Sequence, residues 1–250
     1  DMLFAEMLDM DHDATYVGFN TLGNPNSSGD FLRYLCDDSV AALHAVVERV
    51  KNGDFTDSGV PSRVVVIGHS YGGLQVARLM MLYDKYDTLL DTVDAELVAP
   101  AFKSTRSAAS LPRFLLSAIR SLGKSVPLIM PVIVNPYDAV SDKNDITDLL
   151  RESAQRNNIN RLITVEGTFD TFLCGKDFVL DKQRRKGTSS MRIFYGSDDT
   201  IVETSFFDDM ELLKRIGVQT VYRMEGARHS PHEDSIYVKR VAAKMTEKVS

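Results

Sequence analysis

A short glycine-rich segment between an apolar run and a helical pattern constrains the fold more than any other feature of this chain. The run Val64-Val65-Val66-Ile67 predicts a buried strand, and the residues Gly68-His69-Ser70-Tyr71-Gly72-Gly73 predict a sharp turn that leads into a helix. A G-x-S-x-G turn needs small residues two before and two after the serine, because a Cβ atom at either place would clash in so tight a bend. The segment therefore predicts a strand, a turn with Ser70 at its apex, and a helix.

Ser70 is the candidate nucleophile of this turn. The turn holds the serine hydroxyl above the carboxyl edge of the sheet, and the helix that begins at Tyr71 directs its first backbone N–H groups toward the same place. The backbone N–H of Tyr71 is therefore the candidate donor to an oxyanion. Because a serine hydroxyl is a weak nucleophile at neutral pH, a base and an orienting acid are expected later in the chain.

Two later loops supply candidates for the acid and the base. Asp198 and Asp199 follow an expected strand at 190–195, and His229 follows another expected strand at 219–224. Since the carboxyl ends of parallel strands meet at one edge of a sheet, both loops are expected beside Ser70. The order serine, aspartate, histidine is also the order of the catalytic triad in hydrolases built around this turn.

Strands alternate with helical patterns through most of the chain, which predicts an α/β fold with a mostly parallel sheet and helices on both faces. Helices are expected at about 37–51, after the elbow, at 206–216 and at 236–245, and further strands at 15–20 and 96–99. Residues 22–29 are dense in turn formers and predict a loop.

The interval 101–186 interrupts this alternation and is expected to be an insertion. Its clearest pattern is an apolar stripe at helical spacing, formed by Leu111, Phe114, Leu115, Ala118, Ile119 and Leu122. A lid over an apolar pocket has such a stripe, and so does a helix packed wholly into an ordinary core. The break in the βα rhythm favours the lid.

Composition argues against several classes of function. With 250 residues, of which 44% are hydrophobic, the chain suits one large domain or a core with a modest insertion. The net charge of -6 argues against nucleic-acid binding, and the basic residues between 182 and 186 are interpreted as a solvated loop. The longest apolar stretch, at 126–134, is too short and too broken by prolines to cross a membrane.

The two cysteines, Cys36 and Cys174, supply neither a disulfide framework nor a metal site. Reduced, partly buried thiols are the favoured interpretation, and a single bridge is the alternative. No signal-peptide pattern is present, and the chain opens with Asp1, so its natural beginning is expected to have been removed or left out. Of the possible compartments, the cytoplasm is slightly favoured.

Taken together, these motifs resemble the α/β-hydrolases, and among them the capped monoglyceride-lipase, lysophospholipase and related serine-hydrolase group. The resemblance spans nearly the whole chain and implies a hydrolase core at 1–100 and 187–250 with a cap at 101–186. It rests on GHSYGG at 68–73, YGSDDTIV at 195–202, GARHSPHED at 226–234 and an insertion after the strand that ends near Pro100.

The family pattern also assigns site residues. The acid is the third residue after the loop glycine and falls on Asp199, with Asp198 as the alternative. The histidine falls on His229, with His232 as the alternative, and the pattern implies no catalytic role for His69.

The resemblance implies acyl transfer in two steps, with no metal ion and no organic cofactor. His229 takes the Ser70 proton as an ester carbonyl is attacked and returns it to the leaving alcohol, while Asp199 orients the imidazole. The expected partner is a small-molecule acyl ester such as a monoacylglycerol or a lysophospholipid. Two alternatives remain open: an aminopeptidase-like or small-ester hydrolase on the same fold, and a non-catalytic receptor or binding protein with this fold.

The N-terminal part departs from the family pattern. The second oxyanion donor normally lies in a loop after the third strand, often beginning with His-Gly, and no such segment precedes residue 15. If residues 15–20 are the fourth strand, the first three are absent, and the sheet would be left with unpaired backbone groups beside the Ser70 strand. We therefore expect either a fragment, in which residues 1–10 form the helix after the lost loop, or a second polypeptide that fills the gap. In a third option, residues 15–20 are the third strand and Asn20–Gly23 the oxyanion loop.

Overall fold

Four parallel strands form the main sheet, in the order β1-β2-β5-β6. The structure is a computed structural model that describes residues 2–11, 13–18, 35–55, 59–86, 93–126, 128–131, 141, 162–181 and 189–247. The strands are β1 (Val64–His69), β2 (Val93–Val98), β5 (Met191–Gly196) and β6 (Thr220–Met224). Because all four run the same way, the loops that follow them lie at one edge of the sheet.

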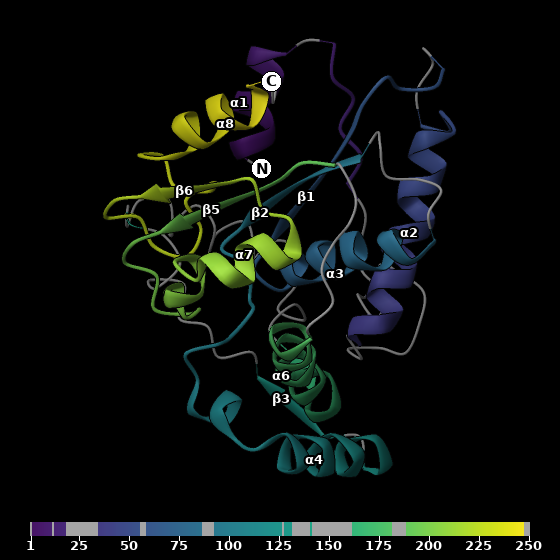
Figure 1. The fold of residues 1–250 in the computed structure, drawn as a ribbon, viewed down its shortest axis with the longest axis vertical. Helices are drawn as coiled ribbons and strands as arrows, with labels where there is room; N and C mark the ends of the chain where they lie inside the picture. The colour runs from purple at the N-terminus through teal and green to yellow at the C-terminus, as the bar shows by residue number, and fades with distance from the viewer. Residues whose placement is uncertain are drawn as a thin grey trace.

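Helices cover both faces of this sheet, as Figure 1 shows. On one face lie α1 (Met2–Met10) and α8 (Val238–Thr246), which contact each other. On the other lie α3 (Tyr71–Tyr86) and α7 (Met210–Ile216), with α2 (Cys36–Lys51) against α3. The expected α/β architecture is confirmed, and none of the described helices is long and apolar enough to cross a membrane.

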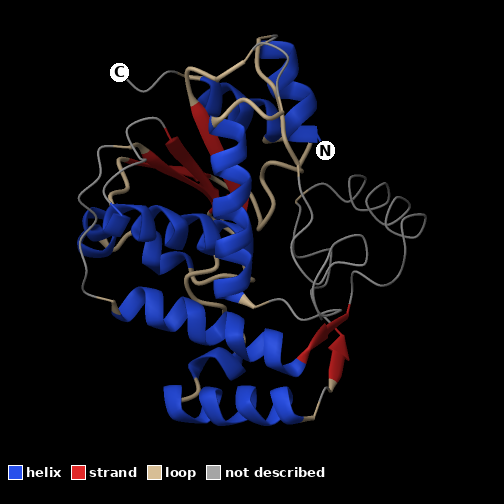
Figure 2. Ribbon diagram, turned by 90° about the vertical axis from the view of Figure 1, so that its right-hand side faces the viewer, coloured by secondary structure: helices blue, strands red, loops and turns tan. Residues whose placement is uncertain are grey.

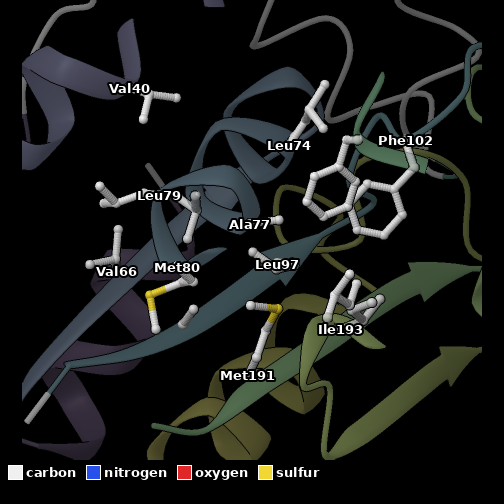
Figure 3. Close-up of a cluster of buried hydrophobic side chains, with 14 of the residues drawn as sticks. Val40, Val66, Leu74, Ala77, Leu79, Met80, Leu97, Phe102, Met191 and Ile193 are labelled. Carbon is white, nitrogen blue, oxygen red and sulfur yellow. The ribbon is translucent and has the colours of Figure 1, made fainter. Parts of the chain in front are cut away.

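The core between α3 and the sheet holds the strand β1 and the helix α3 in a fixed relation (Figure 3). Apolar residues recur along α3 at intervals of three and four, so one face of the helix meets the sheet. The side chains that meet there are buried: Leu74, Ala77, Leu79 and Met80 from the helix, and Val66, Leu97, Met191 and Ile193 from the strands. This packing determines where the turn between β1 and α3 points.

A second group of elements lies apart from the main sheet (Figure 2). The helix α6 (Val165–Leu180) packs between the core helices and α4 (Arg113–Ser125), and two short strands, β3 (Ile129–Pro131) and β4 (Leu162–Thr164), pair antiparallel. A short 3-10 helix, η2 (Ser107–Ser110), precedes α4.

The apolar stripe expected at 111–122 falls largely on α4, but its side chains are not core residues. Leu116 and Gly123 are the buried positions of α4, whereas Phe114 is 71% exposed and Leu122 is 61% exposed. The alternative in which the stripe packs wholly into an ordinary core is therefore wrong. The face of α4 that packs toward α6 contains Leu116 and Gly123, one position along the chain from the predicted stripe.

The helix expected at 206–216 is divided in two. A 3-10 helix, η5 (Thr204–Phe207), is followed by α7, which begins where the Asp209 carboxylate accepts the backbone N–H groups of Glu211 and Leu212. The helix ends at Gly217 with φ 79°, as its sequence predicts. The helical spacing of apolar residues continues across this boundary, so it did not predict that a new helix begins at Asp209.

The N-terminal expectations have mixed outcomes. The helix expected at 1–10 is α1, whose Leu3 and Met7 are buried in a cluster with α8. Residues 15–18 do not form a strand, so the expectation there is wrong, and residues 19 and 20 lie outside the described residues. The loop 22–29 and the proposed oxyanion segment also lie outside them. In the part of the chain that the structure describes, β1 is an edge strand.

Cys36 and Cys174 form a disulfide that joins the first turn of α2 to α6. The interpretation as two reduced thiols is wrong, and the single bridge holds. The two residues are 138 positions apart, so nothing local in the sequence shows that they meet. Disulfides are typical of oxidising compartments, and the cytoplasmic location stays a prediction.

Candidate active site

Ser70 lies between β1 and α3 with a backbone φ of 53°. A positive φ is uncommon outside glycine and costs on the order of 1–3 kcal/mol, so the surrounding contacts must hold it. The Ser70 N–H donates to Val98 O at 2.9 Å, and the Ser70 carbonyl accepts from Ala101 N–H at 2.9 Å. Both partners belong to β2 and the loop after it, so the turn is attached to the neighbouring strand.

The glycines of the turn are not equivalent. A Cβ atom on Gly68 would lie 2.5 Å from Gly72 O and 2.7 Å from Val76 Cγ2, and one on Gly73 would lie 3.0 Å from Pro100 Cα. A Cβ atom on Gly72 would have no heavy atom within 4 Å. The expectation that both Gly68 and Gly72 must lack a side chain is therefore confirmed for Gly68 and wrong for Gly72. Gly68 lies against the backbone of Gly72, so a Cβ atom on Gly68 would clash there, whereas a Cβ atom on Gly72 would point into open space.

Tyr71 presents its backbone to the site and its side chain to the interior. As the first residue of α3, its N–H has no acceptor within the helix and is free to bind an oxyanion. Its hydroxyl is buried, and the side chains of Gln75 and Thr171 lie near it. Burial, with the nearby Asp170 carboxylate, raises the pKa of Tyr71 above its usual range, so the phenol is neutral beneath the turn.

The loop after β5, which carries Asp199 (the acid loop), and the loop after β6, which carries His229 (the base loop), meet at these two residues. Asp199 Oδ2 lies 2.8 Å from His229 Nδ1, and the two side chains are 0% and 5% exposed. The other carboxylate oxygen, Oδ1, accepts the backbone N–H groups of Ile201 at 2.8 Å and Val202 at 3.1 Å. The carboxylate is thus held by its own loop and directed at the imidazole.

The alternative acid, Asp198, lies in a different environment. It is exposed, and its Oδ1 accepts from the hydroxyl of the adjacent Ser197 at 2.9 Å. Its backbone N–H donates to Ala227 O at 2.9 Å, which ties the acid loop to the base loop. The side chain that reaches the histidine is therefore that of Asp199.

The residue that precedes the serine, His69, contacts the loop that carries His229. The Nε2 atom of His69 lies 3.2 Å from His229 O, so the base loop touches the turn. No hydrogen bond joins Ser70 Oγ to the His229 ring among the described residues. Such contacts are often long in enzymes without substrate and shorten when substrate binds.

Two further histidines surround the base. The His69 ring centroid lies 4.8 Å from that of His229 and 4.4 Å from that of His232. Burial lowers the pKa of His69 well below its usual value and that of His232 to about 3, and the neighbouring imidazoles act in the same direction. The sequence pattern implied no role for His69 and gave His232 as the alternative base, and the ring that reaches Asp199 is that of His229. The signal was that three of the five histidines lie in the two motifs that meet here.

A cavity of about 300 Å³ lies between α6 and the loop that follows β2. It begins at Ala101, whose N–H donates to Ser70 O, and its lining among the described residues contains no carboxylate and neither Ser70 nor His229. Its two cations are Lys103, which pairs with Glu203 at 2.6 Å, and Lys176, whose Nζ donates to Leu111 O at 2.7 Å. The apolar part of the lining comes from Ala101, Phe102, Ala109, Phe172, Val179, Leu180 and Phe206.

Within the described ranges, no group of three or more His, Cys, Asp or Glu residues is placed to hold a metal ion. The chemistry that these residues can perform is that of a strained serine, a buried histidine and a carboxylate.

Comparison with known proteins gives one family and a set of structural neighbours. The model of the "Alpha/beta hydrolase family" matches residues 12–242. No curated protein sequence matches the chain significantly.

The solved structures that resemble the chain include three lipases or esterases. A monoacylglycerol lipase from Paleococcus ferrophilus has a TM-score of 0.72 and 16% identity, over 97% of this chain and 86% of that one. A soluble variant of monoglyceride lipase from Saccharomyces cerevisiae, in complex with a substrate analog, has a TM-score of 0.65 and 15% identity, over 86% of this chain and 69% of that one. An esterase from Exiguobacterium antarcticum has a TM-score of 0.60 and 12% identity, over 97% of this chain and 85% of that one. At these identities the likeness concerns the fold.

Proposed function

Because the chain belongs to the alpha/beta hydrolase family, we propose that it is a serine hydrolase that cleaves a carboxylic ester through an acyl-enzyme. The observation that carries the proposal is the buried pair of Asp199 and His229, 2.8 Å apart, beside the turn that presents Ser70. A buried acceptor on Nδ1 keeps the proton there, which leaves Nε2 of the same ring as the base.

The reaction follows from these roles. Ser70 Oγ attacks the ester carbonyl while His229 Nε2 takes its proton, and the resulting oxyanion accepts a hydrogen bond from Tyr71 N–H. Collapse of the intermediate expels the alcohol, which receives the proton from His229 and leaves an acyl group on Ser70. Water then attacks the acyl group in the same manner and releases the carboxylic acid. One oxyanion donor of this kind contributes about 2.7–4 kcal/mol to the transition state.

Asp199 contributes orientation and charge. Its two oxygens are engaged separately, one by the backbone N–H groups of its own loop and one by His229, so the carboxylate cannot rotate away from the ring. It stabilises the imidazolium that forms when His229 takes the serine proton.

The cavity beside the turn supports an acyl ester over an amine substrate. An aminopeptidase-like site binds the substrate ammonium through a carboxylate, and the described residues that line this cavity include two lysines, Lys103 and Lys176, and no carboxylate. Apolar side chains provide the remaining contacts that an acyl chain needs. A monoacylglycerol or a lysophospholipid is the proposed substrate class, and the first of the two is what the two lipase neighbours are named for.

We also propose that residues 101–186 form the cap and residues 1–100 with 187–250 the core. In support, α4, β3 and β4 lie apart from the main sheet (Figure 2), while α6 is joined to the core helix α2 by the disulfide. The cap would then be attached to the core near the acyl cavity.

Labelling and turnover test the proposal together. A fluorophosphonate probe should label the protein at Ser70, and a series of p-nitrophenyl esters from acetate to palmitate should be hydrolysed. The variant Ser70→Ala should lose both properties, and the control Ser62→Ala, at an exposed serine, should keep both. Labelling without turnover of any ester would favour a receptor with this fold, and equal turnover by Ser70→Ala would exclude the mechanism.

A further inference from the structure

The His69 side chain links the turn that carries Ser70 to the loop that carries His229. Its Nε2 atom lies 3.2 Å from His229 O and 3.3 Å from Ser230 Oγ. A backbone carbonyl only accepts hydrogen bonds, so the contact with His229 O assigns the proton of His69 to Nε2, and the Ser230 hydroxyl then accepts as well. In this tautomer His69 donates from Nε2 to the backbone of the residue whose ring is the proposed base.

This contact complements the one from Asp199. The carboxylate of Asp199 holds the His229 ring at Nδ1, while His69 holds the backbone of the same residue at its carbonyl. A ring held only at Nδ1 moves whenever its loop moves, and Nε2 moves with it. Held at both ends, Nε2 keeps a constant position relative to Ser70, which adjoins His69 in the chain.

His232 packs against the same His69 ring. It is 6% exposed, its ring packs 4.4 Å from that of His69, and its Nδ1 has no hydrogen-bond partner among the described residues. It therefore supports His69 by packing and not through a hydrogen bond from that atom. Both histidines are uncharged, so neither opposes the positive charge that His229 acquires during the reaction.

We propose that His69 is a positioning residue, whose Nε2–H holds the His229 carbonyl so that the His229 ring keeps its place relative to Ser70, with His232 packed against the His69 ring. The inference rests on the proposed function for its kinetic consequence, but its structural consequence can be measured without turnover.

The structural test uses the proton on His229 Nδ1, which is strongly deshielded in proton NMR when it is hydrogen-bonded to a buried carboxylate. The resonance is assigned by its loss in Asp199→Asn. It should be lost by exchange in His69→Leu, which removes the donor, and kept in His69→Gln, whose amide nitrogen can occupy the place of Nε2. The control is His44→Gln, because His44 is exposed on α2. An unchanged resonance in His69→Leu would overturn the proposal, whether or not the protein hydrolyses esters.

The kinetic test separates positioning from folding. Since a displacement of about 1 Å costs on the order of 100-fold, kcat of His69→Leu should fall about 10- to 100-fold. KM should change by less than about twofold, because substrate contacts are intact. His69→Gln should recover most of kcat, and a loss as large as that of His69→Leu would contradict the hydrogen bond.

Three further variants keep the test decisive. If His69→Leu does not fold, His69→Asn replaces it, because the shorter amide cannot reach the His229 carbonyl, and the same loss is expected. His232→Phe, which keeps an aromatic ring against His69, should keep the resonance, whereas His232→Ala should weaken it. If His232→Phe and His232→Ala lose it equally, the packing role of His232 is wrong.

Discussion

Asp199 Oδ2 lies 2.8 Å from His229 Nδ1, although the side chain of the adjacent Asp198 is exposed and accepts from the hydroxyl of Ser197. Two adjacent carboxylates thus have opposite environments, one buried against the base and one in solvent. The difference arises because Oδ1 of Asp199 accepts the backbone N–H groups of Ile201 and Val202, which turns its side chain inward.

Replacing Asp199 by Asn should lower kcat by about 10³- to 10⁴-fold, because the amide favours the wrong imidazole tautomer. The matched change Asp198→Asn should alter kcat by less than about twofold, since an exposed carboxylate is screened by solvent. Steady-state kinetics of the purified variants with one p-nitrophenyl ester measures both. A larger loss in Asp198→Asn would reverse the assignment of the acid.

The elbow glycines provide a second matched pair. Gly68→Ala should destabilise the fold and lower activity, because its Cβ would lie 2.5 Å from Gly72 O. Gly72→Ala should fold with little change, since nothing lies within 4 Å of its Cβ. Overpacking of this kind costs about 1–3 kcal/mol, which urea unfolding resolves. Similar losses in both variants would contradict the close approach of Gly68.

The bond between Cys36 and Cys174 makes a prediction about stability. Closing a loop across 138 residues restricts the unfolded chain, so Cys36→Ala with Cys174→Ala should lower the free energy of unfolding by about 2–4 kcal/mol. Reducing agent should lower the stability of the parent protein and leave the double variant unchanged. Mass spectrometry after alkylation without reductant should find neither cysteine modified, and modification of both would show that the thiols are free.

A buried ion pair ties β2, β5 and α8 together. Arg192 Nε donates to Glu96 Oε1 at 2.8 Å, and the Arg192 guanidinium also donates to Lys244 O at 2.8 Å and Met245 O at 2.9 Å. The side chains of Arg192 and Glu96 are 3% and 0% exposed. Burial raises the pKa of Glu96 to about 7 even beside the guanidinium.

Arg192→Met should therefore destabilise the protein in a pH-dependent way. At pH 8 the loss should be about 3–5 kcal/mol, because a carboxylate is left buried without its partner. Because the pKa of Glu96 is higher in the folded than in the unfolded protein, its contribution to stability is fully present below the unfolded-state pKa and falls as pH rises through the folded-state pKa. The stability lost in Arg192→Met should therefore be smaller at pH 5 than at pH 8. Urea unfolding at both pH values measures it.

The control for this prediction is the surface pair of Arg63 and Asp94, whose side chains are 36% and 20% exposed. Arg63→Met should cost about 1 kcal/mol or less, with no comparable change between pH 5 and pH 8. An Arg192→Met loss that is the same at both pH values would show that Glu96 does not take up a proton in the folded protein.

The sequence predicted the strands, turns and helices that have clear local patterns, but not where every helix begins or which of its faces is buried. The run at 64–67, the elbow at Ser70 and the helix that follows were predicted from periodicity and turn chemistry, which act between neighbours in the chain. The break at Asp209 and the exposed face of α4 were missed, because a cap overrides an apolar period and a period alone does not say which side meets a partner.

The sequence by itself determined the α/β alternation, the serine turn and the order in which Ser70, Asp199 and His229 occur, since each depends on short segments. Only the tertiary structure decided that Asp199 reaches His229, that Cys36 meets Cys174, and that His69 touches the base loop. These contacts join segments far apart in the chain, and they form only when the sheet brings its carboxyl edge together. Local pattern cannot show them, because the energy that selects them comes from burial across the whole core.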